Sequence, residues 1–203
     1  MKSDKKAALS KDALGKEPEE ALKQLVARIF ADDDWDYRHT LSAAKWMKHI
    51  VKHEGGDERV LVTAMYLHDI GYAGALKNGY SLDDRIEAKT HHMARGAEQA
   101  RGLLPKLGFS DSEVEKITYL ISVHDRIEEL RTRDELLVLE ADSLAQIDPV
   151  TGNTFGEEEF ARYVEIFERK RAPRFITKTG KAALKKLARE NKLFQKYAVL
   201  LKK

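Results

Sequence analysis

The stretch AMYLHDIGYAG, residues 64–74, places His68 and Asp69 side by side at the end of an apolar run. The residues before them, ERVLVTAMYL, are apolar on nearly all sides of a helix, and such a helix is buried. Burying a charged group without a partner is unfavourable, so this pair needs partners. A metal ion suits both side chains. The same dipeptide recurs at His124-Asp125, so its meaning depends on its context.

Around this stretch, apolar residues recur three and four positions apart, and no alternating pattern persists. These spacings predict an all-α protein. Capping residues and helix breakers predict the boundaries, because Asp57 is a good N-cap and Gly55-Gly56 and Pro105 end helices. We expect helices that begin near Pro18 and near DDDWD (32–36), followed by helices over 58–70, 84–104, 110–124, 134–147, 156–171 and 179–201.

The composition limits the class of protein. The chain has 203 residues, of which 42% are hydrophobic, enough for a sizeable core. It contains no cysteine, which excludes disulfides and thiolate metal sites and fits a cytoplasmic location. No segment has the length and apolarity of a signal peptide or a membrane span. We expect a flexible basic segment over 1–16 and a single domain over 17–203.

The charges are unevenly distributed along the chain. Residues 170–203 contain twelve Lys and Arg against one acidic residue, a net charge of +11, although the whole chain carries only +2. Such a tail can bind a partner such as nucleic acid, or it can be a basic helix that lies on the acidic remainder of the chain. Apolar residues of the tail fall at helical spacings, and such a stripe usually faces a core, which favours the second interpretation. The stripe consists of Leu184, Leu187, Phe194, Tyr197 and Leu201.

Other histidines and one aspartate lie in segments with packed patterns. Neutral imidazole and carboxylate are ligands that suit zinc, iron and manganese. His39 lies in DYRHTLSAAKWM, His92 in HHMARGAEQAR, and His124 follows ITYLIS. Asp142 interrupts LLVLEADSLAQI, which otherwise reads as a core helix. An aspartate at such a position has few purely structural explanations, so these residues are candidate metal ligands.

The order of these candidate ligands resembles the H…HD…H…H…D ligand series of binuclear proteins in the HD-domain superfamily of metal-dependent phosphohydrolases. The series here is His39, His68-Asp69, His92, His124 and Asp142. LHDIG at 67–71 and HMARGA at 92–97 are similar to characteristic stretches of that family. The resemblance covers about residues 36–148. It implies an all-α bundle with the site between helices, here followed by an extra basic C-terminal helix.

Carried over residue by residue, the resemblance implies two divalent transition metals, drawn from Fe, Mn, Zn and Co, with Mg as a further candidate. The catalytic residues would be Asp69, His92 and His124, and a metal-activated water would be the nucleophile. Asp69 would bridge the two metals. The first metal would be held by His39, His68, Asp69 and Asp142, and the second by Asp69, His92 and His124.

The sequence also departs from some members of that family. Tyr72 stands where certain subfamilies have a lysine, Asp125 rather than a second histidine follows His124, and a GYP element is missing. These departures argue against a cyclic-di-nucleotide phosphodiesterase. Arg95 and Arg126 are candidates for contacting a substrate phosphate, because arginine matches phosphate geometry. We expect residues 72–86 to contribute to the substrate pocket.

Three functions are compatible with the sequence. The ligand series favours hydrolysis of a nucleotide or another small phosphate ester or anhydride. The same ligands around two irons would suit an oxygenase acting on a small alcohol or phosphonate. Only the basic tail supports the third function, that of a non-catalytic regulatory or nucleic-acid-binding module. We therefore expect a small phosphorylated substrate as the partner and no membrane, and the sequence does not indicate an oligomeric state.

Overall fold

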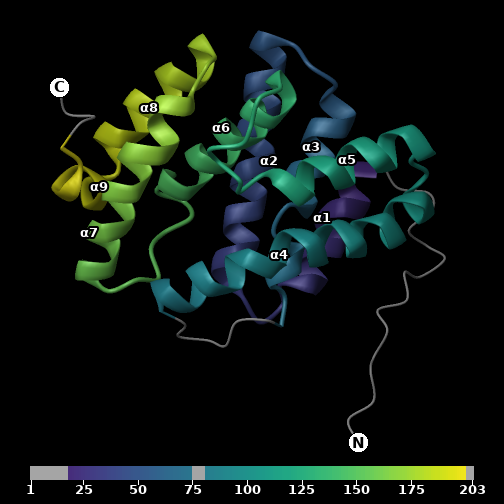
Figure 1. Ribbon diagram of the computed structural model, residues 1–203, viewed down its shortest axis with the longest axis horizontal. Coiled ribbons are helices and arrows are strands. Elements are labelled where there is room, and N and C mark those ends of the chain that lie inside the picture. The colour runs from purple at the N-terminus through teal and green to yellow at the C-terminus, as the bar shows by residue number, and fades with distance from the viewer. Residues whose placement is uncertain (1–17, 75–80, 200–203) are drawn as a thin grey trace, which may run out of the picture.

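The computed structural model of the protein describes residues 18–74 and 81–199 (Figure 1). Within these ranges every regular element is helical, which confirms the all-α fold. The longer helices are α1 (Pro18–Ile29), α2 (Asp34–Glu54), α3 (Glu58–Leu67), α4 (Leu82–Leu103), α5 (Asp111–Val123), α6 (Arg133–Ile147), α7 (Glu157–Ile166), α8 (Lys178–Glu190) and α9 (Lys192–Tyr197). Short helical turns are η2 (Ile70–Tyr72), η3 (Leu104–Leu107), η4 (Phe167–Arg171) and η5 (Ala172–Arg174).

Side-chain caps set several helix boundaries. Asp57 accepts a hydrogen bond from the backbone N–H of Val60 at 3.2 Å and caps α3, as the sequence predicts. Ser110 caps α5 in a capping box with Glu113. Asp33, within the DDDWD stretch, caps α2. Because each cap satisfies an amide that the first helical turn leaves unpaired, local sequence is enough to place these boundaries.

Helix α2 runs through the middle of the bundle (Figure 1). It packs against α3 and α6, while α5 packs against both α3 and α4. The facing side chains are fully buried, among them Met47, Ile50, Leu61, Met65 and Ile121. This packing fixes the ends of α3 and α5 relative to α2, α4 and α6, and the candidate ligands lie at or near these ends.

Helices α7, α8 and α9 lie together on one side of the bundle (Figure 1). A buried carboxylate of α6 binds the segment at the start of α8. Glu140 is fully buried, and it accepts hydrogen bonds from the backbone N–H groups of Ile176 and Thr177 and from the Thr177 hydroxyl. The hydrophobic core continues from Leu22 in α1 to Ala198 after α9. The C-terminal helices therefore extend the same core.

The C-terminal helices differ from the sequence prediction in two respects. The helix expected over 179–201 is broken at Asn191, whose side chain accepts a hydrogen bond from the Phe194 N–H at 2.9 Å and caps α9. The helix expected over 156–171 ends in a wider π-helical turn, η4. The apolar stripe faces the core as predicted, since Leu184, Leu187 and Phe194 are buried, while Leu201 lies outside the described residues.

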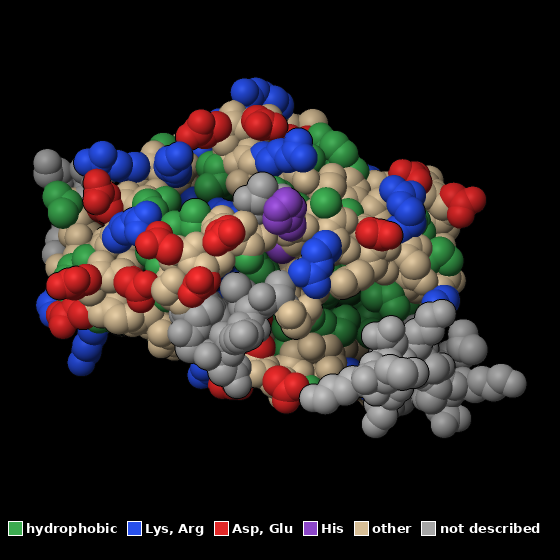
Figure 2. All heavy atoms as spheres, turned by 60° about the horizontal axis from the view of Figure 1, so that its bottom comes forward, with side chains coloured by type: hydrophobic (Ala, Val, Ile, Leu, Met, Phe, Trp, Pro, Cys, Tyr) green, Lys and Arg blue, Asp and Glu red, His purple; other side chains and the backbone are tan. Residues whose placement is uncertain are grey.

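The surface shown in Figure 2 intersperses acidic and basic side chains with small hydrophobic areas. Basic side chains of α8, including Lys181, Lys185 and Lys186, are exposed on the side of that helix opposite its buried residues. Among the described residues, no helix combines the length and the apolar character needed to cross a bilayer.

Candidate metal centre

The local backbone around the LHDIG stretch brings its histidine and aspartate close to α4. His68 directly follows α3 as its C-cap residue, and Asp69 precedes the turn η2. A Cβ atom at Gly71 would lie 1.9 Å from the carbonyl oxygen of His92, so only glycine permits this approach. Gly96 of α4 lies against the same turn. These two glycines place His92 beside Asp69.

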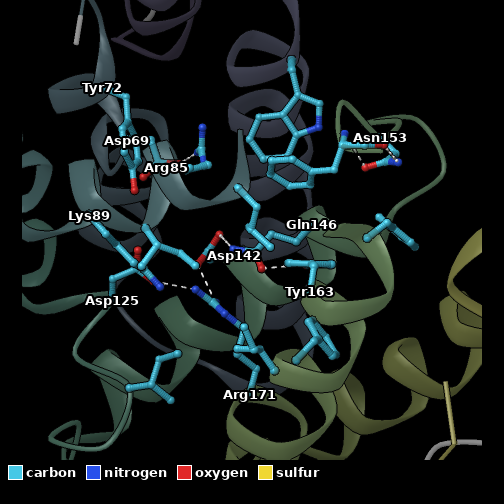
Figure 3. Close-up of a pocket in the computed structure, with 18 of the residues that line it drawn as sticks. Asp69, Tyr72, Arg85, Lys89, Asp125, Asp142, Gln146, Asn153, Tyr163 and Arg171 are labelled. Carbon is cyan, nitrogen blue, oxygen red and sulfur yellow. Dashed lines mark hydrogen bonds and ion pairs between the residues drawn. The ribbon is translucent and has the colours of Figure 1, made fainter. Parts of the chain in front are cut away.

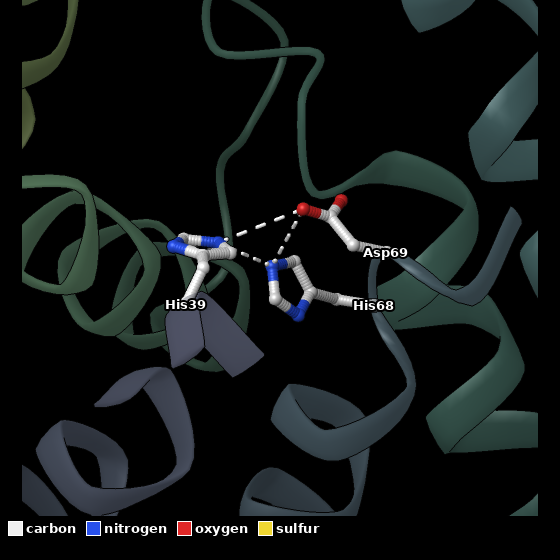
Figure 4. Close-up of side chains that lie close together, drawn as sticks. All are labelled: His39, His68 and Asp69. Carbon is white, nitrogen blue, oxygen red and sulfur yellow. Dashed lines mark hydrogen bonds and ion pairs between the residues drawn. The ribbon is translucent and has the colours of Figure 1, made fainter. Parts of the chain in front are cut away.

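The first cluster of candidate ligands forms between α2, α3 and α6, and Figure 4 shows its members His39, His68 and Asp69. The Nε2 atoms of His39 and His68 are 3.1 Å apart, and Asp69 Oδ2 lies 3.6 Å from the former and 3.3 Å from the latter. Asp142 Oδ1 lies 3.1 Å from His39 Nε2 and 3.7 Å from His68 Nε2. All four side chains are buried.

The second cluster uses the other oxygen of the same aspartate. The Nε2 atoms of His92 and His124 are 3.2 Å apart, and Asp69 Oδ1 lies 3.5 Å and 3.4 Å from them. Asp125 Oδ2 lies 3.7 Å from His92 Nε2 and 3.8 Å from His124 Nε2. Each oxygen of Asp69 thus faces one pair of histidines, and each pair has a further carboxylate beside it.

The hydrogen bonds on the far side of the rings define which nitrogen carries the lone pair. The Nδ1 atoms of His68, His92 and His124 lie 2.8, 2.9 and 2.8 Å from backbone carbonyl oxygens three residues earlier. A carbonyl oxygen only accepts, so each Nδ1 is the donor. In the neutral ring, Nε2 then carries a lone pair. This is the arrangement in which histidine binds metals.

The donor set therefore fits metal ions. When both rings are neutral, the Nε2 lone pairs of His92 and His124 face one another 3.2 Å apart, which is unfavourable unless a cation lies between them. Donors bound to one ion at about 2.0–2.2 Å are separated by roughly 3.0–3.6 Å, and the separations in both clusters are close to this range. His39 differs from the other three histidines, because its buried Nδ1 has no hydrogen-bond partner in the described part of the chain.

Two aromatic rings and one arginine connect the two clusters. The indole of Trp35 stacks on His39 with 5.1 Å between ring centroids, and the ring of Tyr72 stacks on His92 at 4.1 Å. The Arg85 guanidinium lies 4.5 Å from the Trp35 ring centre and 4.2 Å from that of Tyr72. It also pairs with Asp69 at 3.3 Å. Arg85 thus helps to orient ligands of both clusters.

A buried ion network surrounds the outer carboxylates (Figure 3). Arg171, from η4, donates to Asp142 at 2.8 Å and to Asp125. Lys89 lies 3.0 Å from Asp125, and Gln146 donates to Asp142 at 3.0 Å. The cations compensate the charge of carboxylates that are almost fully removed from water.

These contacts shift the pKa values of the site. Burial raises the pKa of Asp69 and of Asp142, but the neighbouring positive groups outweigh it and hold both pKa values well below the usual range. Burial lowers the pKa of His68, yet the Asp69 and Asp142 carboxylates raise it well above its ordinary value. Burial, together with the nearby His124, lowers the pKa of His92 to about 4. His68 and His92 therefore differ in proton affinity.

A cavity adjoins both clusters (Figure 3). Asp69, Asp125 and Asp142 line one side together with cationic groups of Arg85, Lys89 and Arg171. Apolar side chains from α4 and α7 line the other side. Tyr72, Leu82, Arg85 and Ile86 contribute to its wall, and the residues between 74 and 81 lie outside the described part.

The structure brings the six candidate ligands together and separates the two candidate phosphate contacts from them. Arg95 is exposed and donates to the Ala73 carbonyl at 3.3 Å, and Arg126 is exposed and lies 3.8 Å from Glu129. Neither lines the cavity. The sequence places residues 72–86 at the pocket without singling out Arg85, and it does not identify Arg171 as part of the site, because arginine is common on surfaces and nothing in the local sequence marks burial.

Comparison with known proteins identifies the family of this chain. The family model described as HD domain matches residues 36–147. The fold is similar to the crystal structure of a predicted HD superfamily hydrolase from an uncultured Thermotogales bacterium, with a TM-score of 0.57 and 24% sequence identity over 87% of this chain and 86% of that chain. No curated protein matched the sequence. Because the family model covers more than half of the chain, including every candidate ligand, this protein belongs to the HD-domain family.

Proposed function

We propose that this protein is a metal-dependent hydrolase that cleaves a small phosphate ester or anhydride with water. The observation that supports this most strongly is the convergence of two histidine pairs on the two oxygens of Asp69. Paired cation sites of this kind suit the displacement at a phosphoryl group, because both the attacking and the leaving oxygen carry developing charge.

The proposed ligands are His39, His68 and Asp142 at the first position and His92 and His124 at the second, with Asp69 between them. Bound metals would supply Lewis acidity and lower the pKa of a water molecule. Four imidazoles among the six donors favour Fe, Mn, Zn or Co over Mg, which prefers oxygen ligands. The chain fixes these donors through the carbonyl groups behind His68, His92 and His124.

The cavity offers cationic groups for the phosphoryl oxygens. Arg85 is held between two aromatic rings next to Asp69, and Lys89 extends from the following turn of α4 with its side chain 35% exposed. We assign phosphate attraction to Arg85 and Lys89 in place of Arg95 and Arg126, because only the former two line the cavity. Lys89 can turn from Asp125 toward a substrate, since its side chain is flexible and reaches solvent.

The test is phosphate release by protein that was purified without oxygen and loaded with Mn, Fe, Zn or Co. A panel of nucleotides, sugar phosphates and a chromogenic phosphodiester should contain a substrate, and His68→Ala should abolish both turnover and half or more of the bound metal. His91→Ala is the matched control, because His91 is exposed and next in sequence to His92. Oxygen consumption by a two-iron form that releases no phosphate would instead establish an oxygenase.

A further inference from the structure

We propose that the apolar half of the cavity binds the alcohol part of the substrate, and that this alcohol is a small aromatic or branched apolar group. The inference rests on the proposed phosphohydrolase function and narrows its substrate class to monoesters of such alcohols. In the reaction, the oxygen of water bonds to phosphorus and the ester P–O bond breaks. The alcohol leaves with one proton of that water, and inorganic phosphate is the second product.

The apolar wall comes mainly from a part of the chain that the family model does not cover. Phe160, Tyr163 and Phe167 follow one another along one face of α7 and the turn after it, with ring centroids 5.6 Å and 6.3 Å apart. From α4, Leu82 and Ile86 also line this part of the cavity. The metal centre thus lies within the family-matched residues 36–147, while α7 shapes the space beside it.

Polar side chains on this side of the cavity already have hydrogen-bond partners. The Tyr163 hydroxyl donates to Gln146 Oε1 at 2.9 Å, and Gln146 Nε2 donates to Asp142 at 3.0 Å. Both polar atoms of the Asn153 side chain bond to the backbone of Phe155. The hydroxyl groups of a sugar or polyol would lose water here without gaining partners, which is unfavourable. An apolar group incurs no such loss.

The size of the cavity limits the group that it can enclose. Its volume is about 110 Å³. An apolar cavity of about 150 Å³ accommodates benzene. This cavity is smaller, so it encloses at most part of a single ring or of a branched alkyl group, and a whole nucleoside would extend far into solvent. Ile86 is 40% exposed at the edge of this space, where a bound ring would cover it.

Binding of two phosphonates measures the contribution of the ring without any turnover. Phenylphosphonate and methylphosphonate carry the same anionic group on a C–P bond that water does not cleave. Calorimetric titration of the metal-loaded protein in oxygen-free buffer should give a dissociation constant at least about tenfold lower for phenylphosphonate, because the ring is removed from water. Equal dissociation constants, or no binding of either compound, would overturn the proposal.

Two isoleucines provide a matched pair of variants. Ile86 is 40% exposed and lines the cavity, whereas Ile176 is 45% exposed and does not. Because both side chains reach solvent, truncating either one leaves the core intact. Ile86→Ala should reduce the preference for phenylphosphonate by about threefold, since part of the contact area is lost, and Ile176→Ala should leave it unchanged. Equal effects of the two variants would contradict the proposed position of the ring.

Hydrolysis separates a failure of this inference from a failure of the proposed function. Turnover of phenyl phosphate with a kcat/KM at least about tenfold above that of glycerol 3-phosphate supports both. Equal kcat/KM values would retain the hydrolase and overturn the apolar subsite. A preference for phenylphosphonate in binding, combined with no hydrolysis of any ester, would retain the subsite and reject the hydrolase.

Discussion

Arg171 is the residue whose removal should affect this structure most specifically. Its guanidinium is 5% exposed and joins Asp125 and Asp142, whose side chains are 7% and 3% exposed. In Arg171→Met the methionine fills much of the space, but both carboxylates lose their shared cation. Breaking a buried ion pair by removing one partner costs about 3–5 kcal/mol. Lys89 remains beside Asp125, so we expect a loss near the lower limit, about 3 kcal/mol.

The assay is urea unfolding of metal-free protein at pH 7, compared with Arg169→Met. Arg169 is 71% exposed and pairs with Glu165 on the surface, so its replacement should change the free energy of unfolding by less than about 0.5 kcal/mol. The double variant Arg171→Met/Asp125→Asn should recover part of the loss, because it removes one of the two uncompensated charges. A loss for Arg171→Met no larger than that for Arg169→Met would refute the reasoning.

The pH dependence gives a second criterion for the same variant. The pKa values of Asp125 and Asp142 are depressed in the native protein, where the charges of Lys89 and Arg171 outweigh the effect of burial. A depressed carboxyl pKa contributes stability above the unfolded pKa of about 3.9, and this stability is lost as the pH falls through the native pKa. The difference between wild type and Arg171→Met should therefore be constant near neutrality and shrink below about pH 4.

Three further predictions concern the backbone at Gly71, the contact of Arg85 with two aromatic rings, and the competition between protons and metal at the histidines. Gly71→Ala should destabilise the protein by about 3 kcal/mol or more, because a Cβ atom would collide with the His92 carbonyl. Gly102→Ala should stabilise it by about 0.5–1 kcal/mol, because no atom lies within 4 Å of a Cβ atom there. Urea unfolding compares the two variants. Arg85→Lys retains the charge but loses the planar contact with Trp35 and Tyr72, and metal titration should show affinity reduced by about tenfold. Acidification from pH 7.5 to 5.5 should release metal from the His39–His68 position first. His68 has a raised pKa and must lose a proton to bind metal, whereas the pKa of His92 is about 4. Simultaneous loss of both metals on dialysis would contradict this order.

The sequence was sufficient for those parts of the molecule that depend on local signals or on ordered spacing. Asp57 and Ser110 cap helices where expected, because a cap needs only a side chain and the next three residues. The order of His39, His68-Asp69, His92, His124 and Asp142 was enough to group residues that the fold then brings together. Each lies in a segment whose apolar pattern predicts burial.

The sequence was not sufficient for contacts between distant segments. Arg171 reaches Asp142 from 29 positions away through the π-helical turn η4, which no local pattern predicts. Arg85 lies on a helix with many exposed charges, and only the three-dimensional position of Trp35 and Tyr72 distinguishes it. Arg95 and Arg126 were plausible phosphate contacts for the same reason, since residue type alone does not indicate which face of a helix meets the site. The break at Asn191 was missed because apolar spacing continues across it.

The most direct test of the central claim is a crystal structure of metal-reconstituted protein with anomalous scattering recorded at the absorption edge of the metal. We predict two anomalous peaks about 3.5–4 Å apart. One should lie among His39, His68 and Asp142 and the other between His92 and His124, with Asp69 contacting both. A single peak, or metal at His49 and His53, two exposed histidines of α2, with none beside Asp69, would contradict the account.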